Sequence, residues 1–110
     1  MTKINIEELL KEMVKTTSNV LKDKWPDVRT YAEMEFQKLG ETIIHIQKMK
    51  NAGEITEERA RLHIDIQKHA MRTVMLTVEG LGIIAVEEAI NAALNVVRDT
   101  VNTAIGWRLL

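Results

Sequence analysis

The side chains of this sequence that are best suited to chemistry are three histidines, which lie among glutamates and aspartates. Carboxylate-bridged di-iron bundles bind their metal through Glu and through Glu-x-x-His motifs on facing helices. This sequence contains no Glu-x-x-His motif. Glu41 and His45 are four residues apart, and with Glu33 and Gln37 they form a stripe that points away from the apolar positions. Such a stripe is typical of a solvated helix face rather than of a metal site.

Four residues remain as weak candidates for metal ligands: His63, His69, Glu35 and Asp65. We expect His63 to point inward, because the apolar residues of its helix surround it. These apolar residues are Leu62, Ile66, Ala70 and Val74. Across an antiparallel hairpin that turns near Gly53, however, His63 lies level with Ile43 rather than with Glu35. We therefore favour a hydrogen-bonded histidine in the interior or at an interface, keep a metal site shared between chains as the alternative, and expect no cofactor.

Groups for acid–base or nucleophilic catalysis are not brought together by the sequence. Ser18 is the only serine, and no histidine–aspartate pair is predicted beside it. Acidic residues that are adjacent in the chain, such as Glu87 and Glu88, project about 100° apart on a helix. Gly80-Leu81-Gly82 has no preceding strand and no following Lys-Ser or Lys-Thr, so it matches neither a dinucleotide nor a phosphate-loop fingerprint. We expect no enzymatic activity.

The overall composition limits the classes of partner. The chain has 110 residues, which fits one domain spanning 1–110, and it has no cysteine. Its net charge of −1 predicts no electrostatic capture of nucleic acid. The apolar runs 80–86 and 89–97 fall short of the roughly 20 residues that span a bilayer. Because no apolar signal core begins the chain, we expect a cytoplasmic protein, and membrane partners are disfavoured.

Helical periodicity predicts the elements that must position these groups. With one proline and short polar connections, the composition fits an all-α fold in which a short N-terminal helix precedes a helical hairpin. The first helix is expected over about 6–23, capped by Asn5 with Glu8 three residues on. The second is expected over about 26–50, with Pro26 in its first turn. Its apolar stripe has a spacing close to that of coiled coils: Val28, Ala32, Phe36, Leu39, Ile43 and Ile46.

The clearest break in the pattern lies at residues 51–56. Gly53 supplies a helix-ending conformation, and Thr56 caps the next helix, which has acidic residues in its first turn. So short a link predicts an antiparallel hairpin between the second helix and a third helix over about 57–79.

The apolar face shifts at Glu79-Gly80-Leu81-Gly82, where the stripe rotates by roughly a quarter to a third of a turn. A turn needs polar residues for its exposed backbone, and the apolar residues that follow Gly80 offer none. We therefore expect the helix over 57–79 to continue, or to kink, into a helix over 83–105 instead of reversing. This C-terminal helix is long and rich in alanine.

The C-terminal helix has a very wide apolar side, and many of its residues are small. We expect the single stripe of the first helix to be too narrow to cover this side, so that another copy of the chain must pack there. The predicted oligomer interface is Leu81, Gly82, Ala85, Val86, Ala89, Ile90, Ala93, Val97, Val101 and Trp107. The same contacts are expected to bury the apolar chain end, and a dimer is the default because two-fold symmetry is the commonest closure.

The sequence thus predicts a bundle-like protein completed by oligomerisation, and it does not specify a biological task. The preferred hypothesis is a non-enzymatic, self-associating helical module with a structural, scaffold or adaptor role, whose partners are itself and other helical proteins. The first alternative is a metal-binding helical bundle, ferritin-like or other, with a site between chains. The second is peripheral membrane association through the C-terminal helix, which ranks lower because its polar side is rich in Asn rather than in Lys and Arg.

Overall fold

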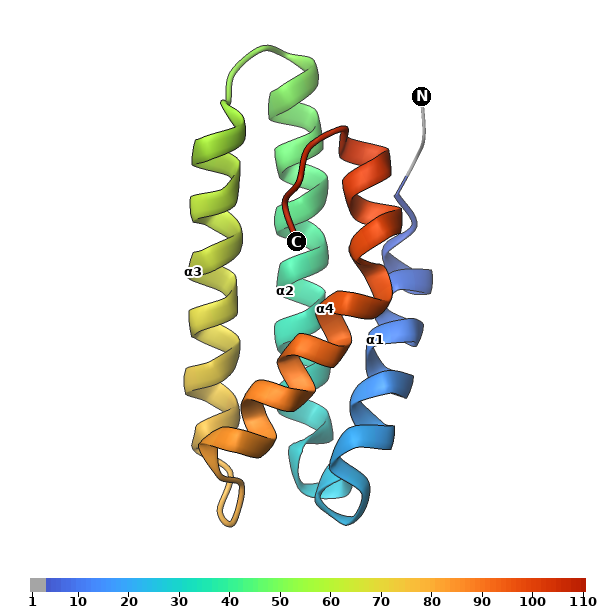
Figure 1. The fold of residues 1–110 in the computed structure, drawn as a ribbon, viewed down its shortest axis with the longest axis vertical. Helices are drawn as coiled ribbons and strands as arrows, with labels where there is room; N and C mark the ends of the chain where they lie inside the picture. Colours follow the sequence, from blue (N-terminus) through green and yellow to red (C-terminus); the bar gives the residue numbers. More distant parts are fainter. Residues whose placement is uncertain (1–3) are drawn as a thin grey trace.

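The computed structural model describes residues 4–110, and the regular structure of these residues is entirely helical, which confirms the all-α prediction. The helices form an elongated bundle of 44 × 22 × 18 Å (Figure 1). In chain order the elements are α1 (Ile6–Leu21), the 3-10 helix η1 (Lys22–Lys24), α2 (Trp25–Asn51), α3 (Glu57–Leu76) and α4 (Ile83–Ile105).

The starts of α1 and α3 and the link between α2 and α3 follow the predicted local signals. The side chain of Asn5 caps α1 by accepting a hydrogen bond from the Glu8 N–H at 3.3 Å. Thr56 caps α3 in the same way, accepting from the Arg59 N–H at 3.2 Å. Gly53, two residues after the end of α2, has φ +72°, a left-handed conformation that favours glycine. The antiparallel α2–α3 hairpin therefore forms where the sequence places it.

The predicted apolar stripe of α2 is the central part of the core. All six of its residues are almost completely buried: Val28, Ala32, Phe36, Leu39, Ile43 and Ile46. Burial of a side chain such as Phe36 stabilises the fold by about 1.5–3 kcal/mol relative to its exposure to water. α2 packs against both α1 and α3, so its stripe holds the hairpin and the N-terminal helix together.

The prediction of one helix across the glycines is wrong. α3 ends at Leu76, residues 77–82 form a turn, and Gly80 adopts φ +83°. Backbone groups of the turn bond to one another, as when the Leu81 N–H donates to the Val78 carbonyl at 3.2 Å. Leu81 is only 6% exposed, so the turn places its apolar residue in the core. The expectation failed because it required polar side chains for hydrogen bonds that neighbouring backbone groups provide.

After this turn, α4 runs obliquely back across the bundle and lies against α1 (Figure 1). The contact between α1 and α4 is the most extensive of any helix pair in the described residues. The buried residues of α1, which packs against both α4 and α2, form one stripe: Leu9, Met13, Thr17 and Leu21. The expectation that α1 is too narrow to cover α4 is therefore wrong, because the oblique path lets α1 and α3 share the apolar side of α4.

Most of the predicted oligomer interface is consequently buried inside one chain. The buried residues of that set are Leu81, Val86, Ala89, Ile90, Ala93, Val97 and Val101. Ala85 and Trp107 are half-buried, and Gly82 is exposed. This surface is thus not the one that a second copy meets in this conformation.

The residues after α4 fold back onto the bundle. The side-chain oxygen of Asn102 accepts hydrogen bonds from the backbone N–H groups of Leu109, at 2.9 Å, and Leu110, at 3.1 Å. The ammonium group of Lys50 lies 4.7 Å from the centroid of the Trp107 ring, a cation–π contact from α2. Leu109 is 6% exposed. The apolar chain end, which the sequence assigned to contacts between copies, therefore docks within its own chain.

Candidate functional site

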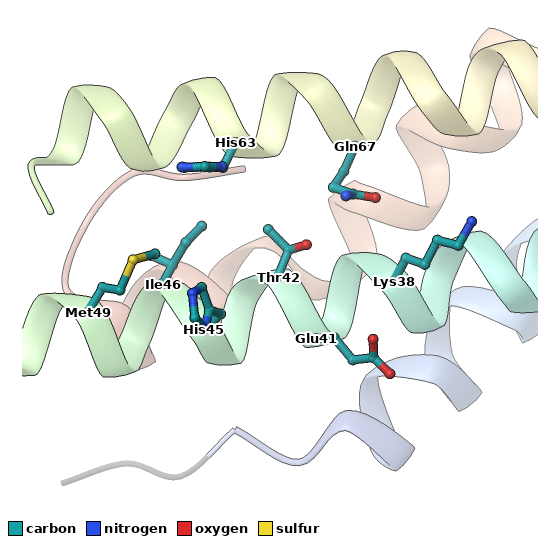
Figure 2. Close-up of a pocket in the computed structure, with 8 residues that line it drawn as sticks. All are labelled: Lys38, Glu41, Thr42, His45, Ile46, Met49, His63 and Gln67. Carbon is teal, nitrogen blue, oxygen red and sulfur yellow. The ribbon is translucent and has the colours of Figure 1, made fainter.

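A groove of about 400 Å³ lies between α2 and α3 and contains two of the three histidines. Its lining residues are Lys38, Glu41, Thr42, His45, Ile46, Met49, His63 and Gln67. Figure 2 shows Thr42 and Ile46 rising from α2 toward α3, with His63 and Gln67 opposite them, whereas Glu41 points away from α3. The side-chain oxygen of Gln67 is buried without a hydrogen-bond partner among the described residues. The groove is therefore lined by both polar and apolar side chains. It contains one buried acceptor, the side-chain oxygen of Gln67, that the sequence did not predict.

The histidines of the groove do not converge on a metal site. His63 is exposed, so the prediction that it points inward is wrong. Within residues 4–110, no three side chains of His, Cys, Asp or Glu are grouped so as to hold a metal ion. The weak candidates His63, His69, Glu35 and Asp65 are thus not brought together within the chain.

Glu35 is a buried carboxylate with a structural partner. It is 2% exposed, and one of its oxygens accepts a hydrogen bond from the Lys38 ammonium group at 3.1 Å. Lys38 lies one turn further along α2 and is itself largely exposed. A buried carboxylate requires such a partner, because an unpaired charge in the interior is very costly. The ion pair accounts for Glu35 without a bound cation.

His69 belongs to a polar cluster that joins α3 to α4. The Arg72 guanidinium donates hydrogen bonds to both carboxylate oxygens of Glu87. It also lies 2.7 Å from His69 Nδ1, and because a guanidinium only donates, Nδ1 is the acceptor. The bond from Arg72 holds the pKa of Glu87 below its ordinary value, partial burial opposes this, and the charges of Arg72 and Lys68 add to the lowering. The same bond raises the pKa of Arg72.

The side of α3 that is turned to solvent differs from the one that the sequence predicted. The four residues that α3 buries are Ala60, Ile64, Met71 and Met75. Leu62 projects from the opposite side of the helix and is 56% exposed, and Ile66 is 61% exposed beside it. The buried side is thus rotated by about a quarter turn from the predicted one, which was centred on His63. The reason is the turn at 77–82, which brings α4 against α3 as a second neighbour.

These exposed residues form part of a continuous surface, which we call the α3 outer stripe: Glu58, Leu62, Ile66, His69, Thr73 and Leu76. All six residues are exposed. Helical spacing places them within about 40° of Leu62 around the axis. α3 stands at the edge of the bundle, so the stripe is accessible along its length (Figure 1). Sequence reasoning recognised Leu62 and Ile66 as apolar-face residues but assigned them to the interior.

Neither the groove nor the polar cluster brings together a nucleophile, a base and a binding site for a reacting group. Among residues 4–110, none of the helices has the length and apolar character needed to traverse a lipid bilayer. No protein-family model matches the chain, and no curated protein or solved structure is similar to it. The α3 outer stripe remains as a surface with exposed apolar side chains, as do Ile83 and Ile84 at the start of α4.

Proposed function

We propose that this protein is a non-enzymatic helical module with a structural or adaptor role, and that it self-associates through the α3 outer stripe. The observation that carries the proposal is the pair of apolar side chains one turn apart, Leu62 and Ile66, which point away from the core of their own chain. Burial of apolar surface is the main favourable term in association between proteins.

The contacts of the ionisable side chains favour a structural rather than a catalytic role. The carboxylate of Glu35 is held by Lys38, and the imidazole of His69 is held by Arg72. Each contact satisfies the hydrogen bonding of a side chain within the folded chain, which is what a structural role requires. A role in assembly uses none of these groups as reactants.

Sedimentation equilibrium tests the proposal over protein concentrations up to roughly 1 mM, where even weak association is detected. The wild-type chain is expected to self-associate, and the double variant Leu62→Gln/Ile66→Gln to shift toward monomer without loss of helical circular dichroism. The matched control is Tyr31→Gln/Met34→Gln, which removes an equally exposed apolar pair from α2 and is expected to behave as wild type. A wild-type chain that stays monomeric, or equal effects of the two double variants, would reject the proposal.

A further inference from the structure

We infer that two copies of this chain dock their α3 helices antiparallel, with a two-fold axis level with Ile64, an inference that rests on the proposed function. A second copy fits the α3 outer stripe because the stripe is complementary to itself. Two of the three apolar residues of the stripe are placed symmetrically about that level, so that Leu62 of each copy packs against the partner's Ile66, and Ile66 against the partner's Leu62, while Leu76 lies beyond the overlap of the two helices.

The charges along α3 decide the orientation. Residues 57–65 of this helix carry three acidic residues, Glu57, Glu58 and Asp65, against two basic ones, Arg59 and Arg61, whereas its C-terminal part carries only basic groups, Lys68, His69 and Arg72. An antiparallel pair places the slightly acidic half of each helix against the basic half of the other, whereas a parallel pair places the two basic halves level. Antiparallel helices also oppose their macrodipoles favourably.

One polar contact follows from this register. Glu58 and His69 lie on the same side of the stripe, and in the antiparallel pair each lies within one residue of the level of the other in the partner copy. His69 Nδ1 already accepts from Arg72, which assigns the ring hydrogen to Nε2. The free Nε2–H is a donor, and the exposed carboxylate of Glu58 is an acceptor for it. Two such contacts flank the apolar centre of the interface.

The size of the interface predicts its strength. α3 has 20 residues, which corresponds to about 30 Å of helix. A single pair of such helices buries less than the roughly 1,200–2,000 Å² of a standard protein interface. We therefore expect a weak, reversible dimer, which a covalent trap can capture.

Cysteine cross-linking tests the arrangement cleanly because the natural chain contains no cysteine. The variants are Glu58→Cys and His69→Cys, each prepared alone and then mixed under mild oxidation. In the antiparallel pair, the level positions bring the two Cβ atoms to about 4 Å, within disulfide range, whereas identical positions lie about 15 Å or more apart. The mixture is expected to form disulfide-linked dimers at least about tenfold faster than either variant alone.

The controls separate this inference from the proposed function. A mixture of His69→Cys with Asn91→Cys, an exposed position on α4, reports cross-linking by random collision and is expected to be slow. Fast cross-linking of each variant with itself indicates parallel helices, and a mixed rate equal to the random one indicates another register. Either result overturns the antiparallel inference, and the proposed function survives if Leu62→Gln/Ile66→Gln still dissociates the assembly. A monomeric wild-type chain rejects both.

Discussion

Arg72 in α3 and Glu87 in α4 form an ion pair across the turn that reverses the chain. The guanidinium of Arg72 bonds to both carboxylate oxygens of Glu87, fifteen residues further along the sequence. A continuous helix through the glycines would have carried these side chains far apart along one axis. The pair therefore exists only because residues 77–82 turn, and it holds the start of α4 beside α3.

The Arg72–Glu87 pair predicts a pH-dependent contribution to stability. Since the pKa of Glu87 is lower in the folded chain than its ordinary value of 4.5, the contribution is complete above that value and is lost as pH falls through the folded pKa. Glu87→Gln is expected to lower the urea midpoint at neutral pH and to have little effect near pH 3. The control is Glu88→Gln, the exposed neighbour, expected to be nearly neutral. An equal loss from Glu87→Gln at both pH values contradicts the prediction.

The two glycines of the turn predict opposite effects of one substitution. Gly80→Ser is expected to destabilise the fold by about 1–2 kcal/mol, because Gly80 has a left-handed φ of +83°. Gly82→Ser is expected to stabilise it by a few tenths of a kcal/mol, because Gly82 is the N-cap of α4, has no side-chain cap and has open space around its Cα. Chemical denaturation measures both. If both variants are stabilised, the helix runs through the glycines and the turn is absent.

The hydrogen bonds that Asn102 accepts from the chain end predict the effect of removing its side chain. Asn102→Ala removes the acceptor for the N–H groups of Leu109 and Leu110, and it is expected to cost about 1–3 kcal/mol. Trp107 should become more accessible, which acrylamide quenching detects in a Trp25→Phe background. The control is Asn91→Ala on the exposed side of the same helix. Unchanged quenching of Trp107 would show that these hydrogen bonds do not hold the chain end.

A buried hydroxyl on α1 predicts a stabilising variant. Thr17 is completely buried, and its Oγ1 has no hydrogen-bond partner among the described residues. Thr17→Val preserves the shape of the side chain and removes the unsatisfied group, so it is expected to stabilise the fold by about 1 kcal/mol. Thr100→Val, at an exposed position of α4, is the control and is expected to have no effect. A loss of stability in Thr17→Val would contradict the prediction, because it would show that the hydroxyl makes a favourable contact in the folded chain.

The sequence by itself determined the local features of this protein. Asn5 and Thr56 cap their helices, Gly53 adopts a left-handed conformation just after α2, and the α2 stripe from Val28 to Ile46 is buried as predicted. These features depend on residues that are close in the sequence. Their side chains either bond to nearby backbone groups or recur with the helical period. Among the candidate metal ligands, Glu35 and His69 have hydrogen-bond partners within the chain, which the sequence did not predict.

Only the tertiary structure decided which surfaces are covered. An apolar side shows that a helix needs a neighbour, but it does not say which one. The turn at Gly80 directs α4 onto α1, and with that neighbour in place α3 buries Ile64 and Met71 and leaves Leu62 in solvent. Which side of α3 is covered was therefore settled by contacts between helices distant in sequence, which helical periodicity does not encode.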